Sequence, residues 1–208
     1  ILEFLNTERI DKFYLSHLNY SGRGNVNRET DAHFKMTRTA MNALFDEAWR
    51  CQTQGIHREF VTGNNDADGV FMLKWAESRF PEQVPHLRAK LAEFGGNSTG
   101  VNIANIDNQG TVHPDSFWWS YPLGNVRDRP FSEIWMDTRD PLMAGLKQKT
   151  RTIGGRCAEC TYFDVCNGNT RVRAWQTTGD FWAEDPGCYL TAAEISAGGP
   201  RPTDTHFS

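Results

Sequence analysis

The sequence has no excess of positive charge, no long apolar run and no secretion signal, and each absence removes a class of function. Its 22 Lys and Arg residues are outnumbered by 26 Asp and Glu residues, which gives a formal net charge of −4. The basic residues are dispersed, whereas a nucleic-acid-binding protein gathers them along one face to follow the phosphates. We therefore expect no nucleic-acid partner.

Long hydrophobic segments are also missing. No stretch approaches the roughly 18 consecutive apolar residues that a membrane-spanning helix needs. The opening segment, ILEFLNTERIDKF, lacks the basic and apolar regions of a secretion signal. We expect a cytoplasmic protein with no membrane partner. The chain lacks an initiator Met and opens in a segment typical of a helix end, so we also expect it to be a piece of a longer polypeptide.

The first 95 residues alternate between strand and helix patterns. Residues 12–20, KFYLSHLNY, form an apolar, aromatic-rich run that ends at the glycines of SGRGN, and residues 57–63, HREFVTG, form a second run. Such runs, closed by Gly, Asn and Asp, are typical of strands followed by loops. Strands that alternate with helices favour a parallel sheet, so we predict an α/β fold.

Three helices are predicted between and after these strands. From Thr30 to about Cys51 the apolar residues recur at steps of three and four, and Thr30 with Asp31 supplies a candidate N-cap. Two further helices are predicted at residues 70–80 and 84–94. Residues 1–95 form the first of two predicted modules.

The second predicted module, residues 96–196, is less regular. Residues 99–114 are typical of a hairpin because two β-rich arms flank the turn residues of NQG. Helices are predicted at 141–149 and around 170–176. The remaining residues, 197–208, are mainly Gly, Pro and polar residues, so we expect a flexible tail.

Four of the five cysteines lie in the second module. They form the pattern C-x2-C-x5-C-x21-C, built from Cys157, Cys160, Cys166 and Cys188. Disulfide frameworks are typical of short secreted chains, so we interpret the pattern as a metal site. Four thiolates suit tetrahedral zinc or an iron–sulfur cluster. Structural zinc sites usually present two close pairs, so the remote fourth cysteine favours the cluster, while a structural metal and plain thiols stay open as alternatives.

The residues around these cysteines resemble a known module. The strings RCAECTYFDVCNGNTRVRA and GDFWAEDPGCYL are similar to the C-terminal auxiliary-cluster module of radical SAM enzymes, called SPASM or twitch. The upstream string GTVHPDSFWWSYPLGNVRDRPFSEIW resembles the segment that leads into it. More narrowly, the strings resemble the radical SAM enzymes of haem d1 biosynthesis and of the alternative haem pathway. The resemblance covers roughly the whole chain.

The resemblance implies a fold and a cofactor. The expected fold is the C-terminal part of a partial parallel βα (TIM-like) barrel, followed by a small irregular α+β iron–sulfur module. Cys157, Cys160, Cys166 and Cys188 match the four ligands of one auxiliary [4Fe-4S] cluster. Where relatives place ligands of a second auxiliary cluster, this sequence has HPDSF and Thr170, so one auxiliary cluster is expected.

The C-x3-C-x2-C motif that defines the family is absent from these 208 residues. S-adenosylmethionine and a second [4Fe-4S] cluster are therefore expected in an N-terminal part outside this sequence. Cys51 stands alone on a predicted helix, and we interpret it as an ordinary buried residue.

The resemblance also implies a reaction, in which propionate side chains of a sirohaem-derived tetrapyrrole become oxo groups. The auxiliary cluster would relay an electron, and the partners would be the tetrapyrrole substrate and an electron-donor protein. Three alternatives stay open: a radical SAM peptide maturase, an enzyme that decarboxylates propionate to vinyl in haem b synthesis, and a non-enzymatic zinc-binding module.

Several polar residues are candidates for contact with substrate or S-adenosylmethionine. In βα barrels the chemistry lies at the C-terminal ends of the strands. By that rule the candidates are His17, Asn19, Arg23, Asn64, Asn65 and Asp66. Loops of Gly, Asn and Asp are also ordinary turns, and that alternative stays open for each of them.

Three further candidates lie in the second module. His113 occupies a region where relatives place a cluster cysteine, so it is a candidate iron ligand or carboxylate partner, or simply a polar residue at a hairpin end. Arg171 and Arg173 follow the cysteine loop, and a guanidinium suits the carboxylates of a tetrapyrrole. Both arginines are equally typical of solvated charges on a helix.

Overall fold

A computed structural model describes residues 1–196. The predicted tail at 197–208 lies outside the described residues. Strands β1 (Lys12–Ser16) and β2 (Glu59–Gly63) form a parallel pair in which Lys12 lies opposite Glu59 and Ser16 opposite Gly63. The predicted parallel pairing of these two segments is confirmed. Within the described part of the chain no other strand joins this sheet, so a barrel would need strands from elsewhere.

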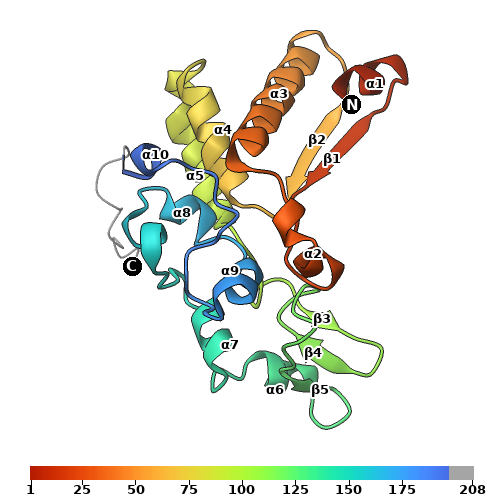
Figure 1. Cartoon of the computed structure of the whole chain (residues 1–208), viewed down its shortest axis with the longest axis vertical. Coiled ribbons are helices and arrows are strands. Elements are labelled where there is room, and N and C mark those ends of the chain that lie inside the picture. The colour runs from red at the N-terminus through yellow and green to blue at the C-terminus, as the bar shows by residue number, and fades with distance from the viewer. Residues whose placement is uncertain (197–208) are drawn as a thin grey trace.

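Helices accompany the two strands in the upper half of the molecule (Figure 1). α3 (Phe34–Thr53) connects β1 to β2, as a crossover between parallel strands must. α4 (Ala67–Glu77) follows β2 and packs against both α3 and α5 (Val84–Phe94). α5 matches its predicted range, α4 begins and ends three residues before its predicted range of 70–80, and α3 begins four residues after the predicted Thr30.

The predicted N-cap of α3 is wrong. The helix begins at Phe34, and Thr30 instead closes the 3₁₀ turn η1 (Arg28–Thr30). The carboxylate of Asp31 accepts hydrogen bonds from the Ala32 backbone N–H at 2.8 Å and from the Tyr20 hydroxyl at 3.2 Å. These contacts fix a bend before the helix, so the side chain that resembled a cap serves the preceding loop.

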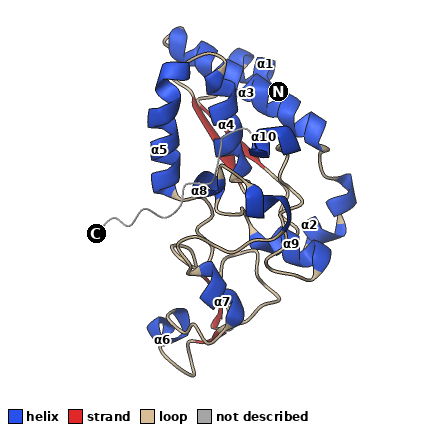
Figure 2. Ribbon diagram, turned by 90° about the vertical axis from the view of Figure 1, so that its left-hand side faces the viewer, coloured by secondary structure: helices blue, strands red, loops and turns tan. Residues whose placement is uncertain are grey.

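The second half is built from short elements, and many of them lie below the two strands and their helices (Figure 2). The predicted hairpin is confirmed: β3 (Asn105–Ile106) pairs antiparallel with β4 (Thr111–His113), and β5 (Gly124–Asn125) adds a third strand. Gly110 lies in the turn at φ +87°, a conformation that glycine adopts readily.

The remaining elements are short helices and turns. They are α1 (Leu2–Thr7), α2 (Arg23–Val26), η2 (Pro81–Gln83), α6 (Phe131–Trp135), α7 (Pro141–Leu146), η3 (Gly155–Glu159), α8 (Phe163–Cys166), α9 (Arg171–Thr178) and α10 (Ala192–Ser196). Within residues 1–196, none of the helices is both long enough and apolar enough to cross a membrane.

One hydrophobic cluster spans both predicted modules. Buried residues of α3 and α4, such as Met41 and Leu73, share a core with Val165, Tyr189 and Ile195 from the cysteine-rich segment. A second cluster surrounds Trp118, α7 and α9. The shared core holds the cysteine-rich segment against the helix that follows β2.

Candidate cysteine site and adjoining cavities

The structure brings the four cysteines of the sequence pattern together. Cys157 lies in η3, Cys160 directly after it, Cys166 at the end of α8, and Cys188 in the returning segment, and all four line one cavity. After Cys166 the backbone at residues 167–169 takes positive φ at three consecutive positions. This tight turn reverses the chain, so α9 begins beside the cavity that α8 has just formed.

Burial governs the electrostatics of these thiols. It raises the pKa of Cys166 well above the usual value, and the neighbouring Cys188 and Cys160 raise it further. Burial likewise raises the pKa of Cys188 to about 11. A metal that binds thiolates displaces their protons, so occupancy of such a site is coupled to pH.

The four cysteine side chains can be compared with the ligand geometry of zinc and of an iron–sulfur cluster. Within residues 1–196, no three His, Cys, Asp or Glu side chains are arranged to hold a single metal ion. Zinc would draw four sulfurs to about 2.3 Å from one point. A [4Fe-4S] cluster binds each thiolate through a different iron, so its sulfurs stand further apart. Four cysteines around one cavity supply a donor set that either metal centre can use.

Two arginines hold the walls of this cavity. Arg156 donates to the backbone oxygens of Leu190 at 2.9 Å and Cys188 at 3.5 Å, and pairs with Glu184 at 3.3 Å. Arg171 is fully buried, and its guanidinium donates to the carbonyl oxygens of residues 168, 169, 181 and 183. The turn after Cys166 is thereby fixed to the segment that returns with Cys188.

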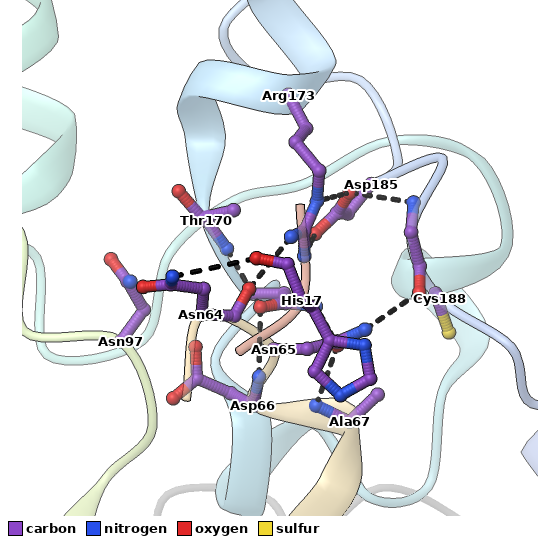
Figure 3. A network of polar contacts seen from close by, with 12 residues as sticks. His17, Asn64, Asn65, Asp66, Ala67, Asn97, Thr170, Arg173, Asp185 and Cys188 are labelled. Carbon is purple, nitrogen blue, oxygen red and sulfur yellow. Dashed lines mark hydrogen bonds and ion pairs between the residues drawn. The ribbon is translucent and has the colours of Figure 1, made fainter. Parts of the chain in front are cut away.

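Arg173 connects the cysteine segment to the strand ends (Figure 3). Its guanidinium pairs with Asp185 at 2.9 and 2.7 Å and donates to the backbone oxygens of Asn64 at 2.6 Å and Leu18 at 3.3 Å. The interpretation of Arg171 and Arg173 as solvated helix charges is wrong, because both are buried among these acceptors. Binding of a substrate carboxylate stays a prediction.

Asparagines link the end of β2 to the same network. Asn64, at φ +67°, donates to the Ser16 hydroxyl at 2.6 Å, and Asn65 donates to the Gly187 carbonyl at 2.9 Å. Burial raises the pKa of the next residue, Asp66, to about 6, against the opposing influence of Arg173. The backbone N–H of Asp66 donates to the side chain of Asn169, in the turn after Cys166.

Two large cavities open at these strand ends. One, of about 770 Å³, is lined by His17, Asn19 and Asn64, and another, of about 500 Å³, by Asn19, Asn64, Asn65 and Asp66. The side-chain oxygen of Asn19 is buried and lacks a hydrogen-bond partner among the described residues. Five of the six candidates predicted at the strand ends therefore gather around two neighbouring cavities.

The other two candidates are not among the residues that line these cavities. Arg23 is an exposed residue of α2. His113 is buried in the hairpin sheet, where its ring nitrogens lie 3.1 Å from the Tyr121 carbonyl oxygen and 3.4 Å from the Asp107 carboxylate. His113 is not among the residues that line the cysteine cavity. These contacts match the interpretation of His113 as a polar residue of the hairpin.

Two curated proteins are similar to the chain over most of its length. It is 53% identical over 196 residues to the pre-heme d1 synthase of Dinoroseobacter shibae, an alignment that covers 93% of this chain and 48% of that protein. It is 40% identical over 198 residues to the Fe-coproporphyrin III synthase of Methanosarcina barkeri, which covers 94% of this chain and 50% of that protein. The chain is thus similar to both proteins over nearly its whole length.

Other comparisons are shorter or give nothing. The AdoMet-dependent heme synthase of Nitratidesulfovibrio vulgaris is 36% identical over 89 residues, or 43% of this chain and 23% of that protein. No protein-family model matches the sequence, and no solved structure does. The chain spans about half the length of the two curated relatives that it matches over most of its residues.

Sequence reasoning missed four residues of the site, which are Asp68, Asn169, Asp185 and Tyr189. Asp185 and Asn169 have no pattern that shows which partners they meet. Asp68 lies within NNDADG and accepts hydrogen bonds from His17 and from Tyr189, which directly follows Cys188. The only signal for these residues was proximity in sequence to a strand end or to a cysteine.

Proposed function

We propose that the chain is the C-terminal part of a radical SAM enzyme of haem d1 biosynthesis, which converts propionate side chains of a sirohaem-derived tetrapyrrole to oxo groups. The observation that carries the proposal is the convergence of Cys157, Cys160, Cys166 and Cys188 on one cavity. The 53% identity to a pre-heme d1 synthase over nearly the whole chain supports the choice of pathway.

The proposed fold is the end of a partial parallel βα barrel with an iron–sulfur module attached. β1 pairs only with β2 within the described residues, which leaves its other edge for a further strand. In the longer enzyme, another strand would pair with this edge.

The four cysteines would hold one auxiliary [4Fe-4S] cluster, which supplies one-electron transfer when bound. Because four thiolates can give each iron a protein ligand, electron relay is favoured over an open iron that binds substrate. The chain's own contribution is to keep the ligand segments in place through Arg156, Arg171 and Arg173. S-adenosylmethionine, a second cluster and an electron-donor protein belong to the proposal for the complete enzyme.

The cluster is tested by iron and sulfide analysis of the complete enzyme, purified without oxygen. A Cys160→Ser, Cys166→Ser variant should lose about four irons and four sulfides together with part of the visible absorbance. Cys51→Ser is the matched control, because Cys51 is buried at α3 away from the cavity and should leave both contents unchanged. Stoichiometric zinc in the native enzyme, with iron and sulfide contents that the Cys160→Ser, Cys166→Ser variant leaves unchanged, would contradict the proposal.

The substrate is tested by product mass. The similarity to an Fe-coproporphyrin III synthase favours a second candidate, a reaction on another haem precursor. Incubation with a sirohaem-derived tetrapyrrole should replace propionates by oxo groups, while oxidative decarboxylation would leave vinyl groups instead. A peptide maturase would bind neither tetrapyrrole, and the reported relatives, all named for haem synthesis, favour the tetrapyrrole.

A further inference from the structure

His17 lies at the C-terminal end of β1 in a chain of three hydrogen-bonded side chains. Its Nε2 is 3.0 Å from one carboxylate oxygen of Asp68, and the other oxygen accepts the Tyr189 hydroxyl at 2.6 Å. Asp68 is 4% exposed and belongs to the first turn of α4, where the helix dipole favours negative charge. The imidazole also stacks on Tyr189, with ring centroids 6.1 Å apart.

These contacts decide which nitrogen of His17 is available. A carboxylate accepts hydrogen bonds and donates none, so the neutral imidazole carries its proton on Nε2 and keeps a lone pair on Nδ1. No described residue forms a hydrogen bond with Nδ1. The side chain is 13% exposed and lines two cavities, of about 770 Å³ and 470 Å³. His17 therefore lines both cavities with one nitrogen that accepts no hydrogen bond from the described residues.

We propose that His17 is the proton acceptor of the substrate cavity. Its Nδ1 takes the proton of an O–H group at the reacting carbon of the tetrapyrrole: the O–H bond breaks, an N–H bond forms and the electron pair stays on oxygen. Asp68 then stabilises the imidazolium, as a buried carboxylate does in hydrolase triads. The inference rests on the proposed function, since an oxo group formed from water requires that its oxygen lose both protons.

A purely structural role is the competing explanation, because the same contacts join β1, α4 and the segment after Cys188. The two roles differ in which side chains can replace His17 without loss of activity. The ring's charged and titratable surroundings include Asp68 on α4, Tyr189 beside it, and Asp31, His33, Lys35 and Arg173 around the adjoining cavity. A structural link needs only hydrogen bonds, whereas a proton acceptor needs a basic nitrogen.

The experiment uses the complete, cluster-loaded enzyme with the sirohaem-derived tetrapyrrole. His17→Gln keeps an amide donor for Asp68 but has no basic nitrogen, and it should lower kcat by about 100-fold or more with little change in KM. Formation of 5′-deoxyadenosine should continue, and the visible spectrum should be retained. Asp68→Asn should lower kcat and move the pH at which the rate rises. His86→Gln, at an exposed position of α5, is the matched control and should match the native enzyme.

A kcat for His17→Gln within about threefold of native would overturn the proposal. If His17→Gln loses its cluster, His17→Gly is assayed with added imidazole. Restored turnover supports the proposal. A His17→Gly variant that holds its cluster but gains no turnover from imidazole overturns it. Failure of the native enzyme on every tetrapyrrole would count against the proposed function instead. The inference is then tested by ¹⁵N NMR of histidine, in which a neutral His17 that carries its proton on Nδ1 would overturn it.

Discussion

Arg173 and Asp185 form a buried ion pair. The guanidinium of Arg173 also contacts the backbone just after both parallel strands. The side chains are 1% and 0% exposed, and the two Arg173–Asp185 nitrogen–oxygen distances are 2.9 and 2.7 Å. The same guanidinium donates to the backbone oxygens of Leu18, after β1, and Asn64, after β2. One side chain therefore fixes the segment that carries Cys188 relative to the cavities at the strand ends.

Replacement of Arg173 should be strongly destabilising. Arg173→Met leaves the Asp185 carboxylate buried without its partner, and we expect the free energy of unfolding to fall by about 3–5 kcal/mol. Urea denaturation of the purified enzyme measures the change. Arg139→Ala is the control: Arg139 pairs with Asp137 but is 85% exposed, so no measurable change is expected. An Arg173→Met, Asp185→Leu double variant that is no more stable than the single variant would argue against this account.

Gly96 allows a close backbone approach to the cysteine site. A Cβ at this position would meet the carbonyl group of Cys166, and the residue has φ +71°. Gly96→Ala should therefore displace Cys166 and lower the iron content, in addition to the roughly 1 kcal/mol of strain that alanine has at positive φ. Metal analysis and thermal unfolding measure both effects.

Gly55 is a control that separates contact with Cys166 from backbone strain at positive φ. It has a similar φ of +67°, but a Cβ there would meet nothing within 4 Å. Gly55→Ala should thus show the strain alone, with native iron content. Equal iron content in Gly96→Ala and Gly55→Ala would show that contact with Cys166 is unimportant.

Regular, locally encoded features were predictable from the sequence. β1, β2 and the helices after them follow from apolar periodicity and from glycine-rich breaks, and the spacing of the cysteines indicated a shared site before the cavity was seen. The beginning of α3 was not predictable, because the Asp31 side chain bonds to the loop in front of the helix rather than to its first turn.

Long-range polar partners explain most of what the sequence could not show. Arg173 has the same local pattern as a solvated helical arginine, and only the tertiary fold places Asp185 and two strand-end carbonyls around it. His17 was a candidate from its position after a strand. Its partner Asp68 lies 51 residues away, and Tyr189 lies further still, so no spacing rule connects the three.

Removal of iron should loosen the cysteine segment if the proposed cluster is present. Metal that binds only the folded protein adds to its stability, so anaerobic chelation should lower the thermal midpoint by at least about 4 °C. Limited proteolysis should then cut between residues 155 and 190. The Cys160→Ser, Cys166→Ser variant is the reference, since chelation should lower its midpoint by less than that of the native enzyme. An unchanged midpoint in the native enzyme would mean that no metal stabilises this segment.

Asp66 should make stability depend on pH in a defined direction. Burial raises its pKa from 3.8 to about 6, so the folded protein favours the protonated form more than the unfolded chain does. The contribution of Asp66 to the free energy of unfolding is fully present below pH 3.8, its pKa in the unfolded chain. It is lost as the pH rises through about 6. Asp66→Asn removes the ionised form and should be more stable than native enzyme above that pH, by about 2–3 kcal/mol.

The pH profile distinguishes this cause from a general effect of lost charge. The advantage of Asp66→Asn should grow from about pH 4 to pH 7 and then stay level, because the native carboxylate is fully ionised beyond that range. Asp128→Asn removes an exposed carboxylate and should follow the native profile throughout. Urea denaturation across this pH range measures both variants. A constant difference between Asp66→Asn and native enzyme at every pH would exclude titration of Asp66, since only a group that changes its protonation can produce a slope.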